Sequence, residues 1–192
     1  MRAFVAAALL ASALPLVAAQ IPRQAPEYVV NLPGGRQDLL SKYKGKVVVM
    51  EFLLTTCPHC QKSAGVLSTL QKEYGPKVQV LGVAINLEGD VAGFQRQYAT
   101  GFQVGWGSRE TAMSFLQHSI MAPNFYVPQV VIIDKAGMIR GQWGGADPFV
   151  GDNQEQNMKA FIDKLLAEGG PAGAKKTAAP AKAKPVAKRA TS

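Results

Sequence analysis

The sequence predicts an α/β domain built around a mixed β-sheet. Apolar stretches rich in Val and Ile alternate with segments whose apolar residues have helical spacing. One helix lies between two such strands, and two further strands are joined by a short turn. The chain has 192 residues, of which 47% are hydrophobic and 18% charged, a composition typical of one globular domain.

The first predicted unit is a strand, a helix and a second strand. Residues 46–54 form a nearly unbroken apolar run, which predicts a strand buried on both faces, as in parallel sheets. Residues 63–74 carry apolar side chains at helical spacing, namely Ala64, Leu67, Leu70 and Tyr74. Residues 78–85 form the next apolar run. This order predicts a parallel pair of strands with a right-handed crossover.

The remaining elements are shorter. Helices are predicted at 94–98 and 111–116, and the region around them has room for a helix–strand–helix insert. Residues 129–133 and 138–143 are predicted to form an antiparallel hairpin, and residues 157–166 a last amphipathic helix. We expect four aromatic residues in the core rather than on a substrate surface: Trp106, Phe115, Phe125 and Tyr126.

Residues 1–19 have the pattern of a secretory signal peptide. Arg2 is followed by an apolar run from Phe4 to Leu14, and small residues precede Gln20, where cleavage is expected. The run is shorter than the roughly 20 residues that a membrane span needs. We therefore expect a periplasmic or otherwise exported protein in an oxidising compartment. An uncleaved anchor is the alternative.

The net positive charge of the chain comes mostly from its C-terminal residues. Residues 171–192 contain six of the 21 basic residues and no acid, and their Ala-, Pro- and Lys-rich composition predicts disorder. Residues 20–170, the predicted folded domain, hold 14 bases and all 13 acids, so their net charge is only +1, whereas that of the whole chain is +8. The net charge is therefore no argument for nucleic-acid binding. The tail either has no specific partner or contacts anionic surfaces.

The only two cysteines lie in residues 55–60, Thr-Thr-Cys-Pro-His-Cys. Two cysteines at this spacing, after a buried strand and at the start of a helix, predict a redox site. The helix N-terminus stabilises Cys57 as the thiolate, which is the attacking species. Pro58 suits the first helical turn. Cys60 lies one turn further, is expected to face inward, and can resolve a mixed disulfide.

Two further side chains are candidates for the chemistry. Protonated His59 would stabilise the Cys57 thiolate and so make the disulfide more oxidising. Glu51 lies six residues before Cys57 in the apolar strand. A buried carboxyl tends to keep its proton, and beneath a dithiol it can take or return the proton of Cys60. The alternative is a strand residue that reaches solvent at the end of the sheet.

Other uses of the two cysteines are less favourable. A structural disulfide closing so short a loop contributes about 2 kcal/mol, against about 3 kcal/mol for a 15-residue loop. A metal site could use Cys57, Cys60 and His118, but zinc generally takes four ligands, or three and water. We therefore expect neither a metal nor another cofactor.

Residues 51–60, Glu-Phe-x-x-x-x-Cys-Pro-His-Cys, resemble the active site of DsbA-type thiol oxidants, which have the thioredoxin fold. The frame formed by residues 39–49 and 127–137 is more similar to the TlpA/ResA group of exported thioredoxin-like proteins. The resemblance covers roughly residues 26–168 and implies a thioredoxin-like fold. One departure is Thr56, which stands where thioredoxins and most TlpA-like proteins have Trp.

The resemblance also implies a substrate-binding loop. Val127–Pro128 would be a cis peptide packed against the dithiol, with the backbone groups of Val127 free to pair with a client chain as a strand does. Thr56, beside Cys57, would complete this docking surface. The alternative is an ordinary trans proline at the start of a strand.

We expect an exported thiol–disulfide oxidoreductase that acts as a monomer on client proteins and has a membrane-linked redox partner. The Pro58-His59 pair favours an oxidant and the TlpA-like frame a reductant, and we slightly favour the oxidant. One alternative is a thiol peroxidase, although its Pro-x-x-x-Thr-x-x-Cys loop would need Pro and Thr where Met50 and Leu54 stand. The other is a Cu(I)-binding module, which usually has Cys-x-x-x-Cys spacing and a distant His.

Overall fold

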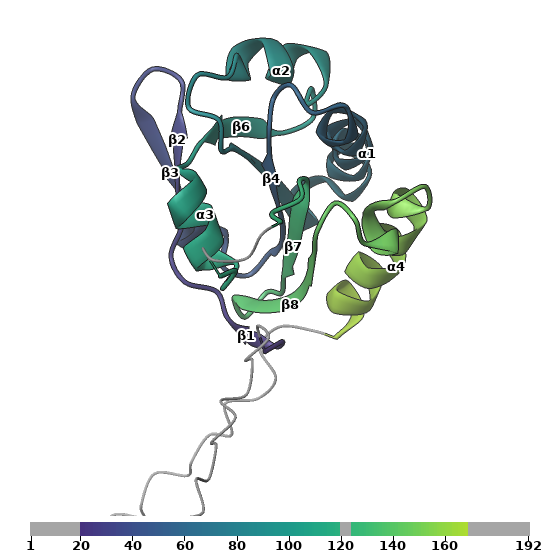
Figure 1. The fold of residues 1–192 in the computed structure, drawn as a ribbon. Coiled ribbons are helices and arrows are strands. Elements are labelled where there is room, and N and C mark those ends of the chain that lie inside the picture. Colours follow the sequence, from purple (N-terminus) through teal and green to yellow (C-terminus); the bar gives the residue numbers. More distant parts are fainter. Residues whose placement is uncertain (1–19, 120–123, 169–192) are drawn as a thin grey trace, which may run out of the picture.

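The computed structural model describes residues 20–119 and 124–168, which form an α/β fold with helices on both sides of a central sheet (Figure 1). A mixed sheet of eight strands has the order β1-β8-β7-β4-β5-β6-β2-β3. The predicted signal peptide, residues 1–19, and the predicted tail, residues 171–192, lie outside the described residues.

The strands are β1 (Arg23–Gln24), β2 (Val29–Leu32), β3 (Arg36–Leu39), β4 (Val47–Leu53), β5 (Val78–Ala84), β6 (Gln103–Trp106), β7 (Gln129–Ile133) and β8 (Met138–Trp143). The α-helices are α1 (Pro58–Tyr74), α2 (Val91–Gln97), α3 (Arg109–Phe115) and α4 (Gln154–Ala167). Short 3₁₀ turns are η1 (Leu40–Tyr43), η2 (Gly75–Lys77) and η3 (Pro148–Val150).

Strand β4 is the centre of the sheet. It pairs in parallel with β5 and antiparallel with β7, so that Val49 lies opposite Val80 and Ile132. All seven of its residues are buried, as the apolar run predicted. The predicted parallel β4–α1–β5 unit and the β7–β8 hairpin are both confirmed.

Side chains of β4 alternate between two cores. Val47, Val49 and Leu53 pack with residues of α1 and α4, whereas Met50 and Phe52 pack with α3 and β2. Figure 1 shows α1 and α4 on one side of the sheet and α3 on the other. Because successive strand residues point to opposite faces, Glu51 shares the face of Val49 and Leu53, beneath α1.

The predicted helix–strand–helix insert is present as α2, β6 and α3. Each short helix has a side-chain cap at its start. The Asp90 carboxylate accepts a hydrogen bond from Gly93 N at 2.7 Å, and the Ser108 hydroxyl accepts one from Thr111 N at 3.1 Å. These caps satisfy amide groups that would otherwise have no partner in the helix.

Several sequence expectations were incomplete or wrong. Strands β1, β2 and β3 were not predicted, because segments of two to four residues are too short to show alternation. Helix α1 begins at Pro58, as the motif predicted, although the apolar spacing alone marked only residues 63–74 because the first turn is polar. Phe115 is in the core, but Tyr126 is 56% exposed, so its expected burial is wrong.

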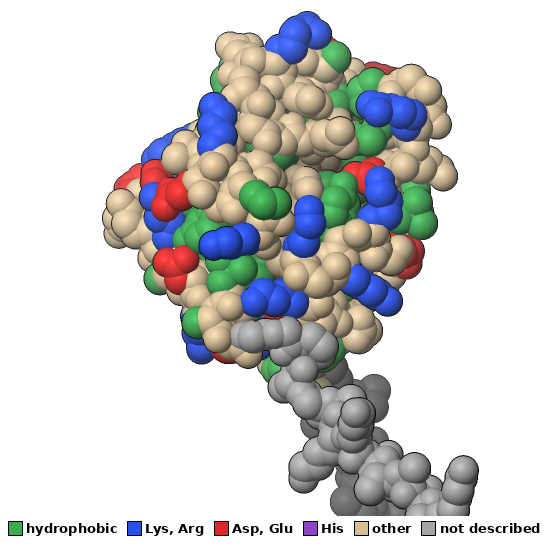
Figure 2. Space-filling model, turned by 180° about the vertical axis from the view of Figure 1, so that it is seen from behind, with side chains coloured by type: hydrophobic (Ala, Val, Ile, Leu, Met, Phe, Trp, Pro, Cys, Tyr) green, Lys and Arg blue, Asp and Glu red, His purple; other side chains and the backbone are tan. Residues whose placement is uncertain are grey.

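Across the two described ranges, no helix combines the length and the apolar character that a bilayer crossing requires. Figure 2 shows the face turned away from Figure 1, where Lys and Arg side chains are scattered among other residues.

Candidate functional site

The two cysteines lie where β4 passes into α1. Cys57 is the N-cap residue of α1, with φ −82° and ψ 119°, and Pro58 is the first helical residue. Cys57 N donates to Leu54 O at 3.1 Å, and Cys57 O accepts from Gln61 N at 3.0 Å. Pro58 costs no hydrogen bond here because the first amide groups of a helix have no partner within it.

The two thiols differ in access. Both are free, Cys57 is partly exposed, and Cys60 is fully buried, which confirms the expected inward orientation. Thr56, Pro58 and His59 are exposed around Cys57. A partner sulfur can therefore reach Cys57 first, and Cys60 only after local rearrangement or from within the molecule.

Glu51 lies on β4, opposite Gly82 of β5 and Val130 of β7, and has no exposed surface. Within the described residues, neither carboxylate oxygen meets the geometry of a hydrogen bond. Burial raises the pKa of Glu51 to about 8, and the Ser63 hydroxyl offsets part of that rise. The alternative of a carboxylate reaching solvent at the end of the sheet is wrong.

Cys60 is electrostatically coupled to this carboxyl. Burial raises the pKa of the Cys60 thiol well above its usual value, and the negative charge of Glu51 raises it further. A Glu51 carboxyl with a pKa near neutrality can exist in both protonation states at working pH. The site thus joins a buried thiol, which resists ionisation, to a buried group that can exchange protons.

The turn before Cys57 is fixed by three hydrogen bonds to Thr55. Asn86 Oδ1 accepts from Thr55 N at 3.2 Å, and Asn86 Nδ2 donates to Thr55 Oγ1 at 2.9 Å. Gln61 Nε2 donates to Thr55 O at 3.2 Å. Every polar group of Thr55 is therefore engaged, which ties the loop to both α1 and the end of β5.

The predicted cis peptide at Val127–Pro128 is present. Pro128 is buried. Val127 and Cys57 both pack against the hydrophobic core that contains Cys60. A Cβ atom at Gly145 would lie 2.4 Å from Val127 O, so this close approach requires glycine. The expected pairing of Val127 with a client chain stays a prediction.

Sequence reasoning missed three residues that support the site: Asn86, Ser63 and Gln154. Asn86 begins a turn directly after a strand, a place where a side-chain amide often bonds to backbone, so it had a weak local signal. The contact between Ser63 and Gln154 joins residues 91 positions apart and had none.

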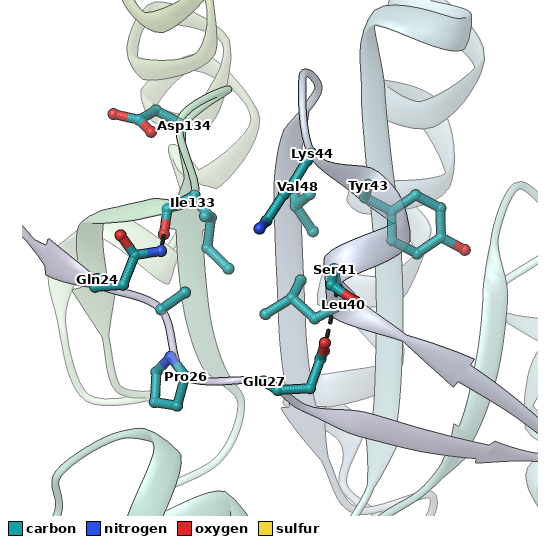
Figure 3. A pocket seen from close by; sticks show the side chains of 12 residues that line it. Gln24, Pro26, Glu27, Leu40, Ser41, Tyr43, Lys44, Val48, Ile133 and Asp134 are labelled. Carbon is teal, nitrogen blue, oxygen red and sulfur yellow. Dashed lines mark hydrogen bonds between the residues drawn. The ribbon is translucent and has the colours of Figure 1, made fainter. Parts of the chain in front are cut away.

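A pocket of about 180 Å³ lies at the opposite end of β4 from the dithiol (Figure 3). Leu40, Val48 and Ile133 form apolar parts of its wall, and Lys44 lies among the lining residues. Glu27 Oε1 accepts from Ser41 N at 3.0 Å at its edge. The pocket is separate from the site around Cys57.

His118 has a structural contact. Its Nε2 lies 3.1 Å from Asn124 O, and its ring meets the edge of Phe125. Among residues 20–119 and 124–168, no group of three or more His, Cys, Asp or Glu side chains is arranged to hold a metal ion.

Comparison with known proteins places this geometry in a family. The model of the AhpC/TSA family matches residues 21–142. The chain is 27% identical over 156 residues to the thioredoxin-like protein YneN of Bacillus subtilis, covering 77% of this chain and 81% of YneN. It is 25% identical to the thiol-disulfide oxidoreductase ResA of Bacillus cereus, covering 76% and 79% of the two chains.

The fold is similar to that of a thiol:disulfide interchange protein of the thioredoxin family from Chlorobium tepidum. The TM-score is 0.63 at 19% identity, covering 78% of this chain and 99% of the other. The likeness to the TlpA/ResA group is thus confirmed, whereas the likeness to DsbA-type active sites stays a prediction. With a thioredoxin-like fold, thiol–disulfide oxidoreductase homologues and a Cys57–Cys60 pair, the chain belongs to the AhpC/TSA family.

Proposed function

We propose that this protein exchanges its Cys57–Cys60 disulfide or dithiol with the thiols or disulfides of client proteins. The observation that carries the proposal is the pairing of a partly exposed Cys57 with a buried Cys60 next to a buried Glu51. One sulfur is open to a partner, and the other is held inside with a proton carrier beside it. The similarity to the thiol-disulfide oxidoreductase ResA supports the same reaction.

In the oxidising direction, a client thiolate attacks the Cys57 sulfur of the disulfide. The bond between Cys57 and Cys60 breaks, and Cys60 leaves as a thiolate that takes the proton of neutral Glu51. A second client thiolate then attacks the client sulfur of the mixed disulfide, and Cys57 leaves as a thiolate. The client loses two electrons and the dithiol gains them.

In the reducing direction the same atoms move in reverse. Ionised Glu51 takes the proton of Cys60, and the resulting thiolate attacks Cys57 in the mixed disulfide and releases the client thiol. We propose oxidation of clients as the favoured direction, because exposed His59 in the first turn of α1 can add positive charge beside the Cys57 thiolate. Val127, Pro128 and Thr56 supply the docking surface in this proposal.

The direct test mixes the oxidised protein with a reduced peptide that contains two cysteines, and follows the peptide disulfide by mass. Wild type should oxidise the peptide, whereas Cys57→Ser and Cys60→Ser should not, because neither variant can form the Cys57–Cys60 disulfide that accepts the two electrons. A parallel arm measures hydrogen peroxide consumption. Rapid peroxide turnover without peptide oxidation would replace this proposal with a thiol peroxidase.

We further propose export, with removal of residues 1–19. The support is the basic start, the apolar run and the small residues before Gln20. N-terminal sequencing of protein recovered from outside the cytoplasm of a bacterial host should begin at Gln20. Recovery of the uncut chain in the cytoplasm would refute export.

A further inference from the structure

Three buried polar side chains from three elements lie behind the dithiol. Glu51 comes from β4, Ser63 from α1 and Gln154 from the first position of α4, and their exposed fractions are 0%, 1% and 4%. Gln154 Nε2 donates to Ser63 Oγ at 2.7 Å. Burying a polar group without a partner is costly, and in the described residues the Glu51 oxygens are the members of this group that have none.

The hydrogen bond from Gln154 leaves the Ser63 hydroxyl free to act as a donor. An amide NH₂ only donates, so Ser63 Oγ is the acceptor and its own hydroxyl hydrogen points elsewhere. In the described part of the chain that hydroxyl has no carbonyl acceptor in its own helix, unlike Thr69, which donates to Gly65 O at 3.3 Å.

The Glu51 carboxylate is a buried acceptor without a partner: in the described residues neither of its oxygens is within hydrogen-bond geometry of a donor. Ser63 lies one helical turn after Cys60, on the buried face of α1 that covers β4, and Glu51 faces it from the strand. The lowering effect of Ser63 on the Glu51 pKa agrees with this placement.

We propose that Gln154 and Ser63 are positioning residues, which direct one hydroxyl donor at Glu51 and thereby set the pH at which Glu51 exchanges its proton with Cys60. The inference rests on the proposed function, because it adds a control to the proton carrier of that reaction. The donor stabilises the ionised carboxylate more than the neutral acid, so its loss shifts ionisation to higher pH.

The other groups around Glu51 do not obscure the effect of Ser63 on the ionisation of Glu51. Cys60 on α1 is the titratable group that interacts with Glu51, and Cys57, the N-cap residue of α1, interacts with Cys60. The facing residues of the other elements bear no charge: Gly82 on β5, Val130 on β7 and Met158 on α4. A change at Ser63 therefore acts on Glu51 without altering a charged neighbour.

The experiment titrates the Glu51 carboxyl by ¹³C NMR in the reduced, full-length protein, with Glu51→Gln identifying the signal. Ser63→Ala should raise the midpoint by roughly one pH unit. Ser63→Thr keeps a hydroxyl and should restore the wild-type midpoint, and Gln154→Leu should shift it in the same direction by less. The pH profile of client release by Cys60 should move with the midpoint.

Ser68→Ala is the matched control. Ser68 is a second buried hydroxyl on α1, and it donates to Tyr98 O at 3.2 Å, away from the dithiol. Its removal should lower stability and leave the Glu51 midpoint unchanged.

Equal midpoints in wild type, Ser63→Ala and Gln154→Leu would overturn the proposal. If Ser63→Ala does not fold, Gln154→Leu decides the question alone. An unchanged release profile in Glu51→Gln would refute the role of Glu51 in the proposed function, while the NMR midpoints would still test Ser63 and Gln154. The two failures are therefore distinguishable.

Discussion

Glu51→Gln should change how the stability of the reduced protein depends on pH. The Glu51 pKa is about 8 in the folded protein, against an ordinary value of 4.5. Between these values the folded state binds a proton that the unfolded state has released. The free energy of unfolding therefore falls as pH rises through this window, and it is highest below the unfolded pKa.

The size of the effect follows from that shift. Each pKa unit corresponds to about 1.4 kcal/mol, so for this carboxyl the loss between pH 5 and pH 8 is on the order of 3–4 kcal/mol. Glutamine does not ionise, so Glu51→Gln lacks this slope. Its buried amide changes stability by an amount that is independent of pH, so the slope is the quantity to compare.

Urea unfolding of both proteins with the dithiol kept reduced, at pH 5, 6, 7 and 8, measures the effect. Carboxylates whose pKa is lowered, such as Glu27 and Glu168, contribute equally to both proteins and cancel in the difference. The variant should gain stability relative to wild type with each step in pH. A difference that stays constant from pH 5 to pH 8 would refute a neutral, buried Glu51.

Three further outcomes are expected. Reduced Cys60→Ser, mixed with a client that contains a disulfide, should accumulate a mixed disulfide between Cys57 and the client, visible as a band on non-reducing gels that disappears with reductant; no such band with abundant client disulfide would contradict the assigned order of attack. Leu67→Ala removes a fully buried side chain between α1 and the sheet and should lower the free energy of unfolding by about 2–5 kcal/mol in urea titrations. Gly105→Ala should lose about 1–3 kcal/mol, because its Cβ would lie 2.4 Å from Asn31 O. Gly65→Ala, in open space on α1, should instead gain about 0.5–1 kcal/mol, and equal effects at the two glycines would show that this contact is unimportant.

The parts of the fold that could be predicted are those with a strong local pattern. The apolar run of β4 indicated a strand buried on both faces, and the helical spacing of α1 and the Cys57–Cys60 pair located the dithiol at its start. Each of these signals lies within one stretch of sequence. Burial of Glu51 could be predicted for the same reason, since every neighbour along β4 is apolar.

The parts that could not be predicted depend on contacts between distant segments. Strand β2 pairs with β3 and β6 through few residues, and its four-residue sequence has no distinctive pattern. Gln154 reaches Ser63 across 91 positions, and no local signal connects them. Tyr126 is exposed in the irregular segment before β7, where no periodic pattern indicates which side chains are buried.

The reduction potential of the Cys57–Cys60 couple, equilibrated against glutathione, tests the central proposal most directly. A disulfide donor should have a potential above about −150 mV, near the oxidising end of the thioredoxin fold. With such a potential, the pair should stay in the dithiol form until the ratio of oxidised to reduced glutathione is high. A potential near −270 mV or lower would contradict the oxidant assignment and make the protein a reductant of its clients.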